Sequence, residues 1–553
     1  MGGAGQAGDA AAAGVAGVAG VAEAHAQDQT RACDLLVIGG GVNGAGIARD
    51  AAGRGLSVLL CEKDDLAAHT SSSSSKLVHG GLRYLEQYEF SLVRKALAER
   101  ERVLQSAPHI ARPLRFVMPH DVGQRPAWLI RAGLLLYDAL ASRAFVPGLG
   151  AGISPASRAI DLRRHRAGAA LKADFVRGFE YADGWVDDAR LVALAALDAH
   201  ERGATILTRT ACVGVQRHPM HWSAQLVSKD GRRLQVNARC LVDASGPWAG
   251  RLAAGALPHG HAHAPRLVKG SHIVVPRLFD HSDGYIFQHP DGRIVFALPY
   301  EDAFTLIGTT DVEFAGALDE VAISAEETGY LCALANHYFK AQITPQDVVW
   351  SFAGVRPLAA AGADSASAAS RDFQLDWDAG GGTGAPILTV LGGKITTFRI
   401  LAQQAVDMLA RSLGNRHGAW THAACLPGGD LFGPVPSKRA VLEYDSWAAG
   451  VLARYAFLSP ALVRRYARAY GTRIHVLLDG CRVLADLGPQ IVPGLYAAEA
   501  DYLVRHEWAA SGEDILWRRT KLGLHAPPGS AALVDAWLAA RAPRAPAQRL
   551  QPA

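Results

Sequence analysis

The chain has 553 residues, of which 49% are hydrophobic and 20% are charged. This composition is enough for a large hydrophobic core, and the length corresponds to about three to four average domains. The formal net charge is only +4, so the charge balance gives no argument for nucleic-acid binding, and we expect no nucleic-acid partner.

The seven cysteines are scattered along the chain, and no two of them form a C-x-x-C pair. Most of them lie in apolar runs, which is typical of buried thiols in a reducing compartment. We therefore expect neither a disulfide framework nor a metal site.

Residues 1–30 are mostly Ala, Gly and Val, with three acids and no Lys or Arg. Secretory signals begin with basic residues and transit peptides are rich in arginine, so the segment fits neither. We expect a disordered tail, or a start site assigned upstream of the folded chain. The sequence has no uncharged apolar run of about 18 residues, so it predicts no membrane-spanning helix.

The first predicted unit is a strand (35–38), a glycine-rich turn, a helix (45–54) and a second strand (57–61) that ends in an acid, Glu62. The turn has the spacing G-x-G-x-x-G, formed by Gly39, Gly41 and Gly44. Such a turn lets a pyrophosphate approach the backbone at the helix N terminus. Glu62 follows Gly44 by 18 residues, near the roughly 20 expected of the carboxylate that binds a ribose. The unit predicts dinucleotide binding but does not distinguish NAD from FAD.

A polar loop with five consecutive serines, 63–75, leads into a turn at Gly80 and Gly81. Serine-rich segments are usually flexible linkers. This one lies between the dinucleotide unit and a cluster with His79 and Arg83, which favours a loop that lines the cofactor. The apolar spacing predicts a long helix over 90–105.

The stretch 128–137 is an apolar decapeptide with arginines on both sides. It is too short to span a membrane. Two interpretations remain open from this stretch alone. It forms either a buried helix whose flanking arginines reach solvent or a helix that lies in a membrane interface.

Two further predicted strands, 239–244 and 387–391, end in turns of small residues. Both turns are places where the backbone can approach a nucleotide. Their residues include Ser245, Gly246, Gly393 and Lys394.

Short predicted strands alternate with Gly and Asp turns over 272–307, which favours an antiparallel sheet. Arg356 follows another predicted strand, and Arg371 lies in the loop 359–385. Residues 430–540 are helical by pattern, and the Pro- and Ala-rich end of the chain is expected to be frayed.

A series of sequence motifs runs along the chain between residues 32 and 540. They are IGGGVNGAGI (38–47), SSKLVHGGLRY (74–84), WVDDARL (185–191), KGSHIVVP (269–276), IGTTD (307–311), GVRP (354–357), GGKITT (392–397), RHEW (505–508) and WRRTK (517–521). With these motifs the chain resembles the FAD-dependent, quinone-reducing glycerol-3-phosphate dehydrogenases of aerobic bacteria. Their number and order make the resemblance specific. The N-terminal tail and Ser74 depart from the family pattern, and neither affects an expected catalytic role.

The resemblance implies an α/β fold in which a Rossmann-type FAD-binding domain is interleaved with an antiparallel-sheet substrate domain and followed by a helical C-terminal domain. The expected ranges are a tail at 1–30, the interleaved domains at 31–425 (substrate part mainly 111–174 and 251–350), helices at 430–540 and a frayed tail at 541–553. It also implies FAD as cofactor, a membrane quinone as electron acceptor, and peripheral attachment to the inner face of the cytoplasmic membrane. A homodimer stays open.

The implied reaction oxidises the secondary alcohol of glycerol 3-phosphate to a ketone. The alcohol must lose a hydride to the flavin and a proton to a base, and the phosphate needs cations in a forked arrangement. We expect Arg83, Arg356 and Arg371 to bind substrate. The expected catalytic residues are His272 in proton transfer, His79 near the flavin and Lys394 to stabilise negative charge.

The expected cofactor-binding residues come from the glycine turns and the serine loop. They are Gly39, Gly41, Asn43, Gly44, Glu62, Ser74, Ser75, Lys76, Gly80, Gly81, Ser245, Gly246, Gly393, Lys394 and Thr396. Asp187 and Asp188 fit a helix N-cap pair better than catalytic carboxylates, and Asp311 is expected to hold loops of the substrate domain.

Three other functions stay open at this stage. One is a glycerol-3-phosphate oxidase that uses dioxygen, although the apolar stretch 128–137 favours a membrane acceptor. Another is a flavoenzyme of the same broad fold that oxidises an amine or amino acid. The last is a flavin-containing protein without catalytic activity.

Overall fold

The computed structural model describes residues 29–86, 88–121, 124–141, 153–251, 265–288, 293–358 and 372–541. The tails expected at 1–30 and 541–553 lie outside these residues except for Gln29, Thr30 and Arg541. Gln29 and Thr30 begin the first strand of the fold, paired with Leu234 and Gln235, so this strand starts slightly before the expected boundary.

The first layer is an eight-stranded sheet with the order β17-β18-β10-β1-β2-β7, extended beyond β10 by β9 and β8. Pairing is parallel from β18 to β7, and β17, β9 and β8 are antiparallel. The strands are β1 (Gln29–Ile38), β2 (Val58–Cys61), β7 (Thr205–Leu207), β8 (Thr210–Arg217), β9 (Trp222–Ser228), β10 (Arg233–Asp243), β17 (Gln374–Asp378) and β18 (Ile387–Leu391).

Both faces of this sheet are covered, so its central strands are apolar on both sides. In β1, Leu35 and Val37 pack in one core cluster with the helices α1 (Val42–Gly53), α4 (Asp188–Glu201) and α6 (Phe398–Leu413). Leu36 and Ile38 point the other way and pack with residues of β9 and β10. This explains the uninterrupted apolar run that identified the strand in the sequence.

The second layer is a ten-stranded, mostly antiparallel sheet with the order β15-β11-β14-β13-β12-β4-β6-β3, joined by β16 at β11 and β5 at β6. Among these pairs β12 and β4 are parallel. The strands are β3 (Leu77–Val78), β4 (Ala111–His120), β5 (Arg158–Asp161), β6 (Arg177–Val186), β11 (Arg266–Pro276), β12 (Gly284–Gln288), β13 (Ile294–Tyr300), β14 (Phe304–Gly308), β15 (Val312–Glu313) and β16 (Trp350–Leu358).

Helices also cover both faces of the second sheet. The helix α5 (Ala325–Tyr338) packs on one face, and α2 (Phe90–Ser106) and α3 (Ala127–Leu140) pack on the other. The sheet takes β6 and β16 from beyond the ranges expected for the substrate part. The ten paired residues between β4 and β6 show that β6 belongs to it.

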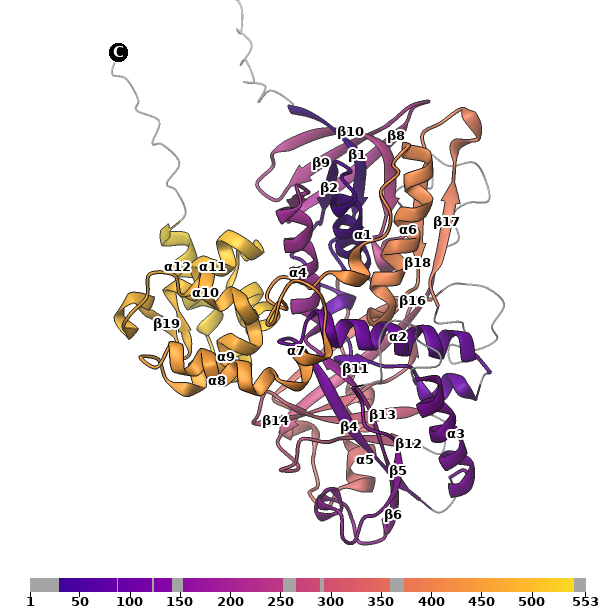
Figure 1. Ribbon diagram of the computed structural model, residues 1–553, viewed down its shortest axis with the longest axis vertical. Helices are drawn as coiled ribbons and strands as arrows, with labels where there is room; N and C mark the ends of the chain where they lie inside the picture. Colours follow the sequence, from indigo (N-terminus) through magenta and orange to yellow (C-terminus); the bar gives the residue numbers. More distant parts are fainter. Residues whose placement is uncertain are drawn as a thin grey trace, which may run out of the picture.

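The third unit is a helical domain with its own hydrophobic core. It lies beside α4 at the edge of the two-layer body (Figure 1). Its elements are α7 (Lys438–Leu442), α8 (Tyr444–Arg454), α9 (Pro460–Tyr470), α10 (Ile474–Leu477), α11 (Ala497–Glu507), a π-helical turn η11 (Asp514–Arg519), α12 (Ser530–Arg541) and the hairpin β19 (Gln490–Val492) and β20 (Leu495–Tyr496). The expected fold class, an α/β body with an antiparallel-sheet part and a helical C-terminal part, is confirmed.

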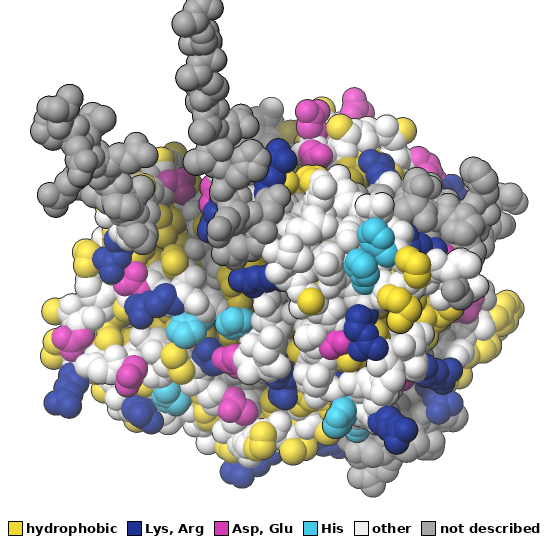
Figure 2. Space-filling view, turned by 90° about the horizontal axis from the view of Figure 1, so that it is seen from above, with side chains coloured by type: hydrophobic (Ala, Val, Ile, Leu, Met, Phe, Trp, Pro, Cys, Tyr) yellow, Lys and Arg dark blue, Asp and Glu magenta, His cyan; other side chains and the backbone are white. Residues whose placement is uncertain are grey.

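Among the helices of the described residues, none is both long and apolar enough to cross a membrane. On the face seen in Figure 2, basic and acidic side chains are interspersed, without one large area of a single sign. This agrees with the small formal net charge of +4.

Candidate active site

A cavity of about 670 Å³ lies where the first sheet meets the second. Its floor is formed at the carboxyl ends of β1, β2, β10 and β18, by Gly39, Glu62, Ser245 and Gly392. Ligands of open parallel sheets bind in this position, because the strand ends there and the turns leave backbone groups exposed. Residues of β11 and β16 from the second sheet line the same cavity.

Two positions of the glycine turn, Gly39 and Gly44, have no space for a side chain. At Gly39 the backbone has a φ of +110°, and an added Cβ would lie 2.5 Å from the carbonyl oxygen of Ala244. An added Cβ at Gly44 would lie 1.9 Å from the carbonyl oxygen of Gly39, so Gly44 lets α1 begin directly against the strand. Gly44 itself does not line the cavity, in agreement with the packing role expected for it.

Glu62 is buried, and its carboxylate is fixed by two backbone N–H groups. Gly40 donates to one oxygen at 2.6 Å and Asp64 to the other at 2.9 Å. Burial raises the pKa of the Glu62 carboxyl, and these two hydrogen bonds oppose the rise. The carboxylate is held at the end of β2, where a ribose would lie.

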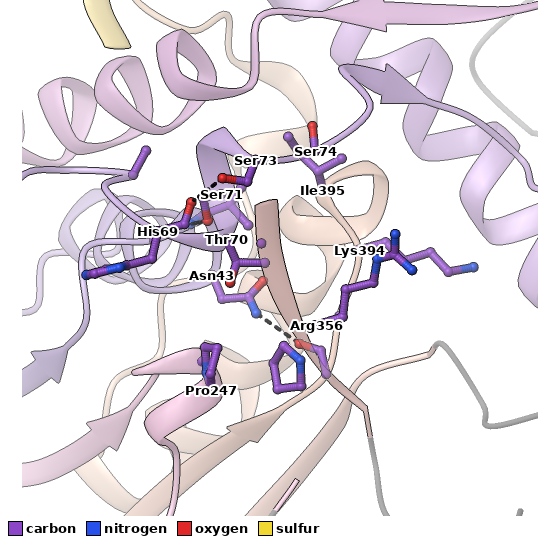
Figure 3. Close-up of a pocket in the computed structure, with 18 of the residues that line it drawn as sticks. Asn43, His69, Thr70, Ser71, Ser73, Ser74, Pro247, Arg356, Lys394 and Ile395 are labelled. Atoms are coloured by element: carbon purple, nitrogen blue, oxygen red, sulfur yellow. Dashed lines mark hydrogen bonds between the residues drawn. The ribbon is translucent and has the colours of Figure 1, made fainter. Parts of the chain in front are cut away.

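The serine loop between β2 and β3 forms one wall of the cavity. Figure 3 shows Thr70, Ser71 and Ser73 of this loop near Asn43, and the side chain of Lys394 to the right of them. Ser71 accepts a hydrogen bond from the N–H of Val42 at 3.0 Å, which ties the loop to the first residue of α1.

Lys76 was expected to bind the cofactor, but it does not line the cavity. Its ammonium group is buried and bonds to both carboxylate oxygens of Asp188, at 2.8 and 2.9 Å, and to the carbonyl of Ser72 at 2.7 Å. Ser74 also donates to Asp188, at 2.7 Å. Asp187 caps α4 by accepting from the N–H of Arg190, so the expected N-cap is present and Asp188 supports the serine loop.

His272 of β11 lines the cavity and is only 1% exposed. Its Nε2 lies 2.9 Å from the hydroxyl oxygen of Ser75, and its ring stacks on Phe352 with centroids 4.8 Å apart. Burial holds the pKa of His272 well below its usual value, and the positive charges of Lys76 and Arg356 lower it further. The imidazole is therefore unprotonated at pH 7, which is the form in which a histidine can act as a base.

Arg356 of β16 also lines the cavity, on a strand that the serine loop contacts, since Thr70 donates a hydrogen bond to the carbonyl of Val355 at 2.7 Å. Its guanidinium pairs with Asp311 and donates to the hydroxyl of Thr309 at 2.9 Å. Lys394 also lines the cavity, and its ammonium group lies 3.7 Å from the centroid of the Tyr84 ring. Arg356 comes from β16 and Lys394 from the turn after β18, so two cations from separate segments line the cavity that His272 lines.

Most of the expected site residues line the cavity. They are Gly39, Gly41, Asn43, Glu62, Ser74, Ser75, His79, Gly81, Ser245, Gly246, His272, Arg356, Gly393, Lys394 and Thr396. Gly80 does not, because its N–H is bonded to Tyr137 and Asp183 behind the wall. Arg83 lies in the short helix η2 (Leu82–Leu85) with its side chain outside the described part, and Arg371 falls outside the described residues.

Several cavity residues were not expected from the sequence. Tyr84 directly follows Arg83 in the SSKLVHGGLRY motif, so its aromatic ring could have been predicted to line the cavity. Thr309 lies two residues before Asp311 in the IGTTD motif. In contrast, Tyr181, Ile286 and Phe296 come from strands whose alternation does not show which face meets the cavity.

The residues present fit FAD. A cavity with glycines at a helix N terminus, a fixed carboxylate at the second strand and a hydroxyl-rich wall suits an adenine dinucleotide. An added Cβ at Gly41 would lie 3.1 Å from the Ser71 hydroxyl, and it would narrow the gap through which a pyrophosphate reaches α1.

Comparison with known proteins gives two family matches. Residues 34–399 match the family described as FAD dependent oxidoreductase. Residues 419–542 match the family described as C-terminal domain of alpha-glycerophosphate oxidase. Together they cover the sheets and the helical domain.

Individual relatives agree with these matches. A glycerol-3-phosphate dehydrogenase of Pseudomonas aeruginosa is 50% identical over 93% of this chain and 96% of its own length. A D-erythritol 1-phosphate dehydrogenase of Brucella abortus is 46% identical over 92% of this chain and 98% of its own. The crystal structure of a glycerol-3-phosphate dehydrogenase from Bacillus halodurans, complexed with FAD, aligns with a TM-score of 0.70 and 25% identity over 93% of this chain and 91% of that one. The chain therefore belongs to the family of FAD-dependent glycerol-3-phosphate dehydrogenases.

Proposed function

We propose that the protein oxidises sn-glycerol 3-phosphate to dihydroxyacetone phosphate and passes the two electrons to a membrane quinone. The observation that supports the oxidation best is that His272, Arg356 and Lys394 line the same cavity as the glycine turn. Bound FAD supplies the hydride acceptor. The names of the relatives from Pseudomonas and Bacillus support the choice of substrate.

His272 takes the proton of the substrate hydroxyl in this proposal. Its pKa lies well below the usual value, so the ring is in the basic form throughout the neutral range. We assign proton uptake to Nε2, because its neighbour at 2.9 Å, Ser75, also lines the cavity. A serine hydroxyl can turn to donate or accept, so it accommodates both protonation states.

Arg356 binds the phosphate in this proposal, and Lys394 stabilises the negative charge that develops on the substrate oxygen. Asp311 and Thr309 hold the guanidinium of Arg356 in place, which prepares its fork for a phosphate. Arg83 and Arg371 remain proposed partners for the same phosphate.

The choice of a membrane quinone rests on the outer face of α3. Its exposed residues are all apolar: Trp128, Leu129, Ala132, Leu135, Leu136 and Ala139. The opposite face, with Leu134 and Tyr137, is buried against the second sheet. An exposed apolar helix face with a tryptophan and neighbouring arginines suits the interface of a bilayer. This supports peripheral attachment, which we assign to the inner face of the cytoplasmic membrane.

Anaerobic reduction of the bound flavin tests the oxidation. We expect glycerol 3-phosphate to bleach the flavin absorbance, and glycine or sarcosine to leave it unchanged. D-erythritol 1-phosphate is the necessary comparison, because a relative of 46% identity is named for it. Bleaching by the four-carbon substrate at much lower concentration than by glycerol 3-phosphate would contradict the proposed substrate.

The same assay with Arg356→Ala tests the phosphate site. We expect the substrate concentration for half-maximal reduction to rise by about 10- to 150-fold, equivalent to about 1.5–3 kcal/mol for a charge-assisted hydrogen bond. An Arg356→Ala protein reduced as readily as wild type at low substrate would exclude Arg356 from phosphate binding.

The electron acceptor is tested by comparing turnover with a quinone analogue and with dioxygen. Stoichiometric formation of hydrogen peroxide at the full rate would exclude the quinone as acceptor.

A further inference from the structure

The helical C-terminal domain contacts the rest of the chain next to the cofactor site. These contacts indicate a role for the domain. Eight of the nine residues from 67 to 75 line the cavity. Because one continuous loop forms this wall, the position of the loop sets the shape of the FAD site.

The first end of the loop is anchored by Asp65, which is 2% exposed. Arg519 of the C-terminal domain donates to its two carboxylate oxygens at 2.9 and 2.8 Å, and Arg518 donates at 2.7 Å. Arg519 is 1% exposed and also donates to the carbonyl of Glu507 at 2.7 Å. The two arginines, more than 450 residues away in sequence, supply the charge that this buried carboxylate needs.

The second end of the loop is anchored by Asp188 at the start of α4, which holds Ser74 and Lys76. The preceding residue, Asp187, accepts from Lys521 of the C-terminal domain at 3.2 and 3.4 Å. One turn later, Arg190 forms a buried ion pair with Glu507. The beginning of α4 thus lies between the loop and the C-terminal domain and is bonded to both.

We propose that the C-terminal domain positions the serine loop for FAD, through the pairs of Arg518 and Arg519 with Asp65 and of Lys521 with Asp187. Both anchors of the loop depend on one short segment, 518–521, that begins in the π-helical turn. Figure 1 shows this domain against α4. Arg518 and Arg519 contact the loop directly, and Lys521 contacts Asp187 at the start of α4. None of the three lines the cavity, so they act on FAD through the loop.

The physical consequence is a coupling between FAD binding and the docking of the C-terminal domain. If docking orders the loop and the ordered loop binds FAD, then FAD must also favour docking by the same factor. The inference rests on FAD as cofactor and does not depend on which alcohol is oxidised, so it can fail while the proposed function holds.

Two substitutions and one control test the positioning role. Asp65→Asn keeps the shape of the side chain and removes its charge, and Lys521→Gln weakens the second anchor. We expect the Kd for FAD, measured by quenching of flavin fluorescence on titrating the apoprotein, to rise by about tenfold or more in each, within the usual range of coupling between sites. Arg473→Gln is the control. It removes another inter-domain ion pair, with Glu201 at 2.7 Å, which does not contact the loop.

A measurement on the unaltered protein keeps the test independent of whether the variants fold. We expect FAD to slow amide hydrogen exchange in the segment 514–521 of the wild type, although this segment does not line the cavity. Exchange in 514–521 that is unchanged by FAD would overturn the proposal. So would a folded Asp65→Asn protein that binds FAD as tightly as Arg473→Gln.

Discussion

His272 shows how burial sets the chemistry of a single residue. An imidazole taken out of water and placed near two cations loses affinity for its proton, and here Lys76 and Arg356 add to the effect of burial. A base that is still neutral at mildly acidic pH can work below the usual titration range of histidine. The same property makes the folded protein less stable in acid.

We predict that flavin reduction by substrate in the wild type shows no loss attributable to His272 between pH 8 and 6.5. Activity requires the unprotonated ring, and the pKa in the folded state lies below the ordinary value of about 6.5, so the loss occurs only at lower pH. His272→Gln should slow reduction by about 10²- to 10⁴-fold. The measurement is the anaerobic rate of flavin reduction as a function of pH.

His109 provides the matched control for this prediction. It is also 1% exposed, and burial lowers its pKa to about 3, but it lies outside the cavity. Below about pH 6.5, both histidines bind a proton in the unfolded state but not in the folded state. Each histidine therefore lowers the free energy of unfolding as the pH falls below that value. His109→Gln should therefore relieve acid sensitivity without the rate loss, and an equal rate loss in both variants would refute the role of His272.

At the scale of the element, α3 explains why the sequence left two interpretations open. The decapeptide 128–137 is apolar on almost every side, so its periodicity could not decide between a buried helix and an interfacial one. The structure shows one buried face and one exposed apolar face. Trp128 is 71% exposed and Leu135 is 52% exposed, which is unusual for large apolar side chains in water.

We predict that Trp128→Glu and Leu135→Glu each weaken binding to vesicles of anionic phospholipid by about tenfold or more. Each change replaces an apolar side chain, whose burial is worth about 1.5–3 kcal/mol, by a charge that the interface disfavours. Co-sedimentation with vesicles measures the binding. Anaerobic flavin reduction by substrate should be unchanged, because the altered side chains point away from the second sheet.

Leu533→Glu on α12 is the matched control for α3. Leu533 is 60% exposed and belongs to the C-terminal domain, so the same substitution there should leave vesicle binding unaffected. Equal loss of binding in all three variants would show that added negative charge, and not the face of α3, determines the result.

At the scale of the whole molecule, the elements with a local physical signal could be predicted. The strand, glycine turn and helix at 35–54 follow from apolar runs and from spacing, because the turn demands glycine at Gly39 and Gly44. Much of the rest came from resemblance, since spacing alone did not separate FAD from NAD. The interleaving of the sheets, with β6 and β16 joining the second one, depends on pairing between distant segments that no local pattern records.

The contacts that hold the site together could not be predicted either. Lys76 was expected at the cofactor because it lies in the SSKLVHGGLRY motif, but Asp188, 112 residues away, binds its ammonium group in the protein interior. Asp65 and Arg519 form an ion pair although they are 454 residues apart in the sequence. Charged side chains at such separations give no signal in one sequence, because any acid could pair with any base until the backbone brings them together.

The place of the cavity between two sheets leads to a prediction about removal of FAD. Each sheet has its own core, and a ligand that contacts the Gly39 turn and the strands β11 and β16 would bind them together. Free FAD at about 100 times its Kd should stabilise the apoprotein by about 2.7 kcal/mol, seen as a rise in Tm. FMN lacks the ADP half that the glycine turn is built to bind, so it should give a much smaller rise. An equal rise in Tm with FMN and FAD would show that the turn contributes nothing to cofactor binding. Gly41→Val should abolish the rise in Tm with FAD, since an added side chain there contacts Ser71.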